Sequence, residues 1–165
     1  MKKGIKIVIN ISFVCYLVAL AVLLFLSSRG FLWSGLTWME YIRNSSNFVP
    51  FKTISTYVTR FFDGSMNRDI PIKNLFGNLL LFLPMGIYLP YYITKINKIR
   101  DLAIAMSVIL ILIEVVQVVT RRGSFDIDDF ILNMLGALMG FGIWKTKIIQ
   151  KLLRQNLQGQ VNENF

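Results

Sequence analysis

The sequence predicts an all-α integral membrane protein: a bundle of four transmembrane helices with a short interfacial helix in the first extracellular loop. The chain has 165 residues, of which 55% are hydrophobic and only 16% are charged, and its mean hydropathy is +0.56. A soluble domain of this length cannot bury so much apolar surface, whereas a bilayer absorbs it. The apolar residues also gather in four stretches, three of which approach the roughly 20 residues that cross a hydrocarbon core.

The four apolar stretches are the predicted spans, and they cover residues 7–26, 75–93, 102–120 and 130–144. The last is short, and snorkelling of the lysines that follow it extends its reach. The first has a basic start, but its apolar run is longer than that of a signal peptide, so we expect an uncleaved anchor. The spans form one domain, residues 1–150, followed by a polar tail, residues 151–165, that we expect to be disordered and cytoplasmic.

The net charge of +9 is explained by membrane topology and does not require a nucleic-acid partner. Ten of the 18 basic residues fall in the short amino-terminal, second-loop and carboxyl-terminal segments, which share one side of a four-span protein. Because basic residues concentrate in short cytoplasmic loops, both termini are predicted to be cytoplasmic. The chain has no His and one Cys, which excludes a His-bearing triad, a His-ligated metal site and an internal disulfide.

The long first loop contains an amphipathic segment. Phe51, Ile54, Val58 and Phe61 recur at helical spacing and form one apolar stripe, while basic and hydroxyl side chains lie elsewhere. We expect a short helix here that lies on the outer membrane surface or caps the bundle.

Polar side chains fall in the outer halves of the last three spans. Glu114 is the most costly, on the order of 3 kcal/mol on insertion scales, so it needs a partner, a water-filled cavity or a proton. Gln117 and Arg121 follow it by three and seven residues, which predicts one shared helical face. Asp126, Asp129 and Asn133 repeat this spacing from the opposite direction, as the fourth span begins. The candidate ligand-binding residues are Asn78, Glu114, Gln117, Arg121, Arg122, Asp126, Asp129 and Asn133.

Each of these residues also has a purely structural interpretation. Asp126 and Asp128 fit the N-terminal capping of the fourth span. The two candidate asparagines suit hydrogen bonds between helices. Glu114 suits a structural ion pair with Arg121 or Arg122.

Two further features concern helix packing. Gly136 and Gly140 form a GxxxG pattern, which allows the backbone of another helix to approach closely, either within the monomer or in a dimer. Pro84, between Phe82 and Gly86, removes one backbone hydrogen bond from the second span and favours a kink near mid-membrane.

Five motifs, in order, resemble the VanZ-like family between about residues 47 and 142. They read NFVPF from Asn47, NLLLFLPMG from Asn78, EVVQ from Glu114, RRGSFDIDD from Arg121 and NMLGALMG from Asn133. The motif positions with a structural character are Asn47, Pro50, Phe51, Phe82, Pro84, Gly86, Gly136 and Gly140. The resemblance implies a small multi-pass protein of the bacterial cell membrane. The namesake is associated with resistance to teicoplanin, a glycopeptide that binds cell-wall precursors outside the membrane.

Three functions are compatible with these residues. The first is a binding protein without a cofactor, whose outer-leaflet pocket holds a lipid headgroup, a lipid-linked cell-wall precursor or a glycopeptide. The second is an enzyme acting on envelope precursors, with Glu114 as general base or with Glu114 and Asp126, Asp128 or Asp129 holding Mg²⁺. The third is a small proton-coupled transporter or a scaffold for the wall machinery. The sequence does not indicate an oligomeric state.

Overall fold

The computed structural model describes residues 2–26 and 35–151, and over these ranges the chain forms helices and no strand. The elements are α1 (Lys2–Ala21), the π-helix η1 (Val22–Leu26), α2 (Trp38–Ser45), α3 (Lys52–Asp63), α4 (Asp69–Leu81), α5 (Leu83–Tyr92), α6 (Ile99–Val119) and α7 (Ile127–Trp144). The predicted tail lies, apart from its first residue, outside the described residues.

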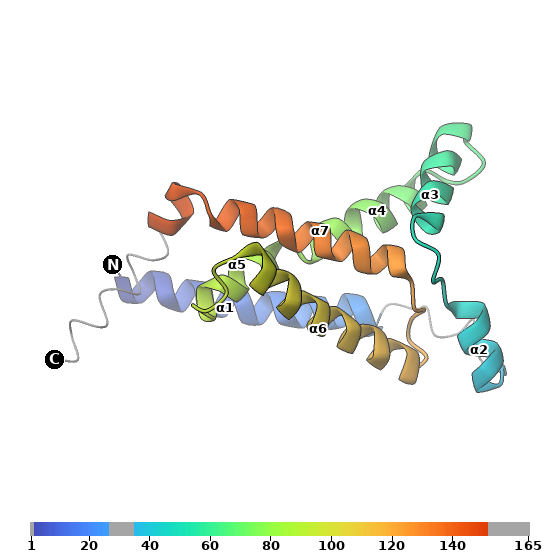
Figure 1. The fold of residues 1–165 in the computed structure, drawn as a ribbon, viewed down its shortest axis with the longest axis horizontal. Coiled ribbons are helices and arrows are strands. Elements are labelled where there is room, and N and C mark those ends of the chain that lie inside the picture. The colour runs from blue at the N-terminus through green and yellow to red at the C-terminus, as the bar shows by residue number, and fades with distance from the viewer. Residues whose placement is uncertain (1, 27–34, 152–165) are drawn as a thin grey trace.

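Four helical segments are long and apolar enough to cross a membrane, which confirms the predicted all-α bundle. They are Gly4–Leu26, Asp69–Tyr92, Ile99–Val119 and Ile127–Trp144. The second begins six residues before the predicted boundary, and the fourth gains a turn at its amino-terminal end. Many large apolar side chains on these helices face outward, as expected for helices surrounded by lipid. Figure 1 shows the start of α1 and the end of α7 at one end of the bundle and α2 and α3 at the other.

Glycines allow α7 to pack closely against α4 and α5. A Cβ added at Gly136 would lie 1.9 Å from the carbonyl oxygen of Leu79, and one at Gly140 would lie 1.9 Å from that of Leu83. A Cβ added at Gly86 of α5 would lie 1.9 Å from the carbonyl oxygen of Ala137 in α7. The GxxxG pattern therefore serves packing within the monomer, because the chain itself covers both glycines.

The second span is broken at the position where a kink was predicted. Helix α4 ends at Leu81 and α5 begins at Leu83, with the fully buried Phe82 between them. Pro84 lies in the first turn of α5, where its missing N–H costs no helical hydrogen bond. Past the break, the N–H groups of Met85 and Gly86 donate to the carbonyl oxygen of Phe82 at 3.1 and 3.4 Å.

Helix α1 is joined to the second span by polar side chains. Tyr16 donates its hydroxyl to the carbonyl oxygen of Leu81 at 2.9 Å, and Tyr92 donates to Asn10 Oδ1 at 2.8 Å. The ring of Phe13 lies 4.8 Å from that of Tyr92. Hydrogen bonds and ring contacts suit this interface, because the hydrophobic effect does not drive helices together inside lipid.

The first loop contains the predicted helix and one that the sequence analysis did not predict. Helix α3 lies where the apolar stripe was found, and α2 precedes it. Helix α2 starts with a capping box, in which Glu40 N–H donates to Thr37 Oγ1 at 3.4 Å and Thr37 N–H donates to Glu40 Oε2 at 2.9 Å. The T-x-x-E pattern was thus a local signal for this helix. Hydrogen bonds from Thr37 hold the pKa of Glu40 below its ordinary value.

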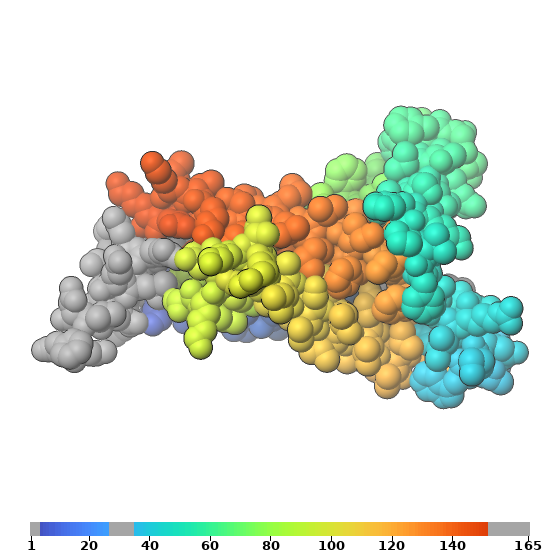
Figure 2. All heavy atoms as spheres, viewed as in Figure 1, coloured from blue at the N-terminus to red at the C-terminus, as the bar shows by residue number. Residues whose placement is uncertain are grey.

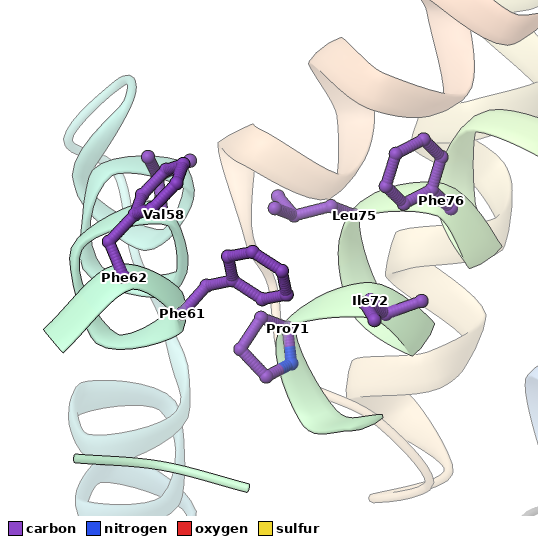
Figure 3. Close-up of a pocket in the computed structure, with 7 residues that line it drawn as sticks. All are labelled: Val58, Phe61, Phe62, Pro71, Ile72, Leu75 and Phe76. Carbon is purple, nitrogen blue, oxygen red and sulfur yellow. The ribbon is translucent and has the colours of Figure 1, made fainter. Parts of the chain in front are cut away.

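The apolar stripe of α3 faces the start of α4. Val58, Phe61 and Phe62 line one side of an apolar groove of about 240 Å³, and residues of α4 line the other. Figure 3 shows the ring of Phe61 directed toward Pro71. Figure 2 shows that α2 and α3 project beyond the long helices. Helix α3 therefore packs on the end of the bundle.

Candidate functional site

A cavity of about 350 Å³ lies between η1, α4, α6 and α7. Its polar lining comprises two carboxylates, three amides and one ammonium. These side chains belong to Lys73, Asn78, Glu114, Gln117, Asp129 and Asn133. The remaining walls are Leu23, Leu24, Gly77, Leu81, Leu110 and Ile113. Five of the eight candidate residues from the sequence thus line one cavity.

The buried wall of the cavity presents two hydrogen-bond acceptors. Glu114 and Asn133 are each only 6% exposed. Among the described residues, no group donates a hydrogen bond to Glu114 Oε2 or to Asn133 Oδ1. A buried polar atom without a partner costs about 1–3 kcal/mol. The cavity is therefore short of donors at its base.

Two of the amides connect the helices that form the walls. Asn78 Nδ2 donates to Asp129 Oδ1 and so joins α4 to the first turn of α7. Gln117 Nε2 donates to the carbonyl oxygen of Leu24 at 3.1 Å and joins α6 to the π-helix η1. Asn78 thus makes the hydrogen bond between helices that the structural interpretation predicted, and the same side chain also lines the cavity.

Arg121 and Arg122 do not line this cavity. The expectation that Arg121 shares a helical face with Glu114 is wrong, because α6 ends at Val119 and Arg121 has a left-handed φ of 52°. Its guanidinium donates to the carbonyl oxygen of Leu36 at 3.1 Å and lies 4.3 Å from the ring centroid of Trp38.

Among the described residues, no ion pair joins Glu114 to Arg121 or Arg122, so the structural ion pair considered for Glu114 is not formed. The ion pair on α6 joins Arg100 to Asp101, at the opposite end of the helix. Arg122 is exposed in the loop.

The cation of the cavity is instead Lys73, which the sequence analysis missed. Its exposed side chain lies at the rim. The predicted second span began at residue 75, so Lys73 was counted among the loop residues. Its spacing of four from Gly77 was the available signal for a common helical side.

Asp126 and Asp128 belong to a separate network that attaches α3 to α7. Asp128 is fully buried and accepts the N–H groups of Phe51, Thr53 and Ile54 at 2.5, 2.7 and 3.1 Å. Asp126 caps α7 by accepting the N–H of Asp128 at 2.9 Å, and it accepts Thr53 Oγ1–H at 2.7 Å. The capping interpretation therefore holds for Asp126, whereas Asp128 caps a different helix.

Asn47 completes the network by pairing its backbone with the loop before α7. Its N–H donates to the carbonyl oxygen of Phe125 at 2.7 Å, and its carbonyl accepts from Ile127 at 3.0 Å. Its Nδ2 donates to Asp126 Oδ1 at 3.0 Å. Two motifs about 75 residues apart thus meet here.

In the part of the chain that the structure describes, no three His, Cys, Asp or Glu side chains form a group able to hold a metal ion.

Comparison with known proteins identifies the family. A family model described as VanZ/LLP1 matches residues 13–150, which include the whole cavity and the network around Asp128. A search of curated proteins and a search of solved structures each found no match. Because the match covers most of the sequence, in agreement with the motifs between residues 47 and 142, the chain belongs to the VanZ/LLP1 family.

Proposed function

We propose that this protein binds the polar part of a cell-envelope amphiphile in the cavity between η1, α4, α6 and α7. The observation that supports this best is Glu114, a buried carboxylate on a membrane span that borders a cavity of about 350 Å³. Such a residue is costly in a bilayer and by default indicates a ligand or ion site. The amides around it suit recognition of hydroxyl and amide groups. A lipid-linked cell-wall precursor, a lipid headgroup and a glycopeptide all offer such groups.

The orientation of the bundle forms part of this proposal. The cavity residues lie near the start of α4, the end of α6 and the start of α7, which is the end of the bundle that carries α2 and α3. The basic residues of the opposite end sit in short segments, as in cytoplasmic loops. With the termini in the bacterial cytoplasm, the cavity opens in the outer leaflet, where envelope precursors and glycopeptides meet.

Thiol labelling tests this orientation. A cysteine at Ser124, placed in a Cys15→Ala background because Cys15 is the only native thiol, is expected to react with an impermeant maleimide in intact cells. A cysteine at Thr94, in the loop at the opposite end, is the control and is expected to react only after permeabilisation. The reverse pattern would move the cavity to the inner leaflet and contradict the outer-leaflet proposal.

Blocking the cavity tests the proposed binding. A Cβ at Gly77 meets no atom within 4 Å, so Gly77→Leu is expected to fill the cavity mouth without disturbing the fold. Gly142→Leu is the matched control, because Gly142 also has open space and lies outside the cavity. Mass spectrometry of protein purified from native membranes is expected to find one enriched amphiphile with the wild type and with Gly142→Leu, and to lose it with Gly77→Leu and with Glu114→Gln.

A second readout addresses the link to resistance. Overexpression of the wild type is expected to lower susceptibility to teicoplanin, and Gly77→Leu is expected to remove this effect. A wild-type protein whose co-purified lipids match the composition of the membrane, with no amphiphile enriched, would overturn the binding proposal.

A further inference from the structure

We infer that the cavity recognises a primary ammonium on a membrane phospholipid, as in an ethanolamine phosphate headgroup. The ammonium donates to Glu114 and Asn133 at the buried base, and the phosphate lies beside Lys73 at the rim. This inference rests on the proposed function and specifies its ligand.

The unpaired atoms at the base of the cavity indicate a ligand that donates hydrogen bonds. Glu114 Oε2 and Asn133 Oδ1 are both acceptors, both belong to side chains more than nine-tenths buried, and both lack a donor among the described residues. A phosphate or carboxylate group offers only further acceptors there. A primary ammonium has three donors, which is enough for both atoms.

The distribution of charge in the cavity favours a zwitterion that enters with its cation first. Two carboxylates, Glu114 and Asp129, face one ammonium, that of Lys73. Glu114 is buried, whereas Lys73 is exposed, so negative charge lies deep and positive charge lies at the mouth. An ethanolamine phosphate has the complementary order of charges. An anionic headgroup such as glycerol phosphate would bring negative charge toward Glu114 and Asp129.

The mouth of the cavity favours a ligand that arrives from the bilayer. Leu23 at the rim is 58% exposed, and Gly77 beside it leaves open space. Both lie on segments that are apolar enough to span the membrane. A headgroup can therefore enter sideways while its acyl chains stay in lipid, a route that a soluble amine does not share.

Lipids that differ only in the headgroup test the inference. Native mass spectrometry of the purified protein measures binding of phosphatidylethanolamine, phosphatidylcholine and phosphatidylglycerol with identical acyl chains. Phosphatidylcholine has the same charges but no N–H donor, so it isolates the hydrogen bonds. We expect phosphatidylethanolamine to bind at least about tenfold more tightly than either of the others, since a hydrogen bond to a charged group is worth about that much. Free phosphoethanolamine is expected to compete poorly, which separates the lipid from its soluble headgroup.

Variants assign the preference to the cavity. Glu114→Gln is expected to bring the three affinities to near parity, whereas Glu40→Gln, the same substitution at an exposed site outside the cavity, is expected to leave the preference unchanged. The wild type could bind all three lipids equally, and Gly77→Leu could abolish that binding. This result would overturn the ammonium inference and keep the proposed function. A preference for phosphatidylglycerol, or one for phosphatidylethanolamine that survives Glu114→Gln, would also overturn the inference. No binding of any lipid or native amphiphile would overturn both.

Discussion

Replacing Gly86 with alanine is expected to lower the free energy of unfolding by at least about 3 kcal/mol, at the upper end of the cost of overpacking a well-packed core. The added methyl group would lie 1.9 Å from the carbonyl oxygen of Ala137 and 2.7 Å from the backbone nitrogen of Phe141. Both neighbours are backbone atoms of α7, so no side-chain rotation relieves the overlap. Helix α5 must instead move away from α7, which opens the centre of the bundle.

Gly142→Ala is the matched control for this substitution. Gly142 also lies inside a helix, but a Cβ there meets no atom within 4 Å. Alanine favours a helix interior over glycine by up to about 1 kcal/mol, so the control is expected to be neutral or stabilising. Thermal unfolding in detergent, followed by circular dichroism, compares the two variants. Equal melting temperatures would contradict the close packing of α5 on α7.

Replacing Asp128 with asparagine is expected to release α3 from the end of the bundle. The Asp128 carboxylate accepts three N–H groups in the first turn of α3, and hydrogen bonds to a charged group are each worth about 1.5–3 kcal/mol. The asparagine side chain has no charge, and its amide hydrogens face the same donors. We expect the anchor to lose about 3 kcal/mol, with the three N–H groups left partly unpaired.

Hydrogen exchange measures the release directly. Amides of residues 51–63 are expected to exchange at least about a hundredfold faster in Asp128→Asn, as a loss of about 3 kcal/mol implies. Asp63→Asn makes the same change at the other end of α3, where the exposed carboxylate accepts only the N–H of Ser65 among the described backbone groups. That control is expected to leave the protection of α3 nearly unchanged. Unaltered exchange in Asp128→Asn would show that the apolar groove alone holds α3.

The first turn of α7 connects this anchor to the cavity. Asp128 faces α3, and its neighbour Asp129 lines the cavity and accepts a hydrogen bond from Asn78. Consecutive residues on a helix point about 100° apart, so a single turn serves both sides. Asp126 and Asp129, which the sequence placed in one candidate site, therefore have different tasks, because Asp126 binds Thr53 of α3 and Asp129 lines the cavity.

Periodicity along single helices was enough to predict most of the cavity. The spacing of Glu114 and Gln117, and that of Asp129 and Asn133, places each pair on one helical face whatever the helix packs against. The apolar stretches predicted the four spans for the same reason, because the bilayer supplies the environment that a soluble fold must build from its own chain. The small residues of GxxxG likewise predicted a close helix contact.

Contacts between segments far apart in the sequence decided the partners of the remaining charged side chains. Arg121 leaves the helical face because α6 stops two residues earlier. Its guanidinium then contacts the carbonyl oxygen of Leu36 and the ring of Trp38, about 85 residues away in the sequence. Asp128 turns to α3 because three backbone donors 74 to 77 residues earlier in the chain meet there. A charged side chain in a short loop or in the first turn of a helix has several partners within reach, and only the assembled helices select one. The local sequence thus determines which helices form and which faces are polar, whereas the tertiary structure determines which polar groups share the cavity.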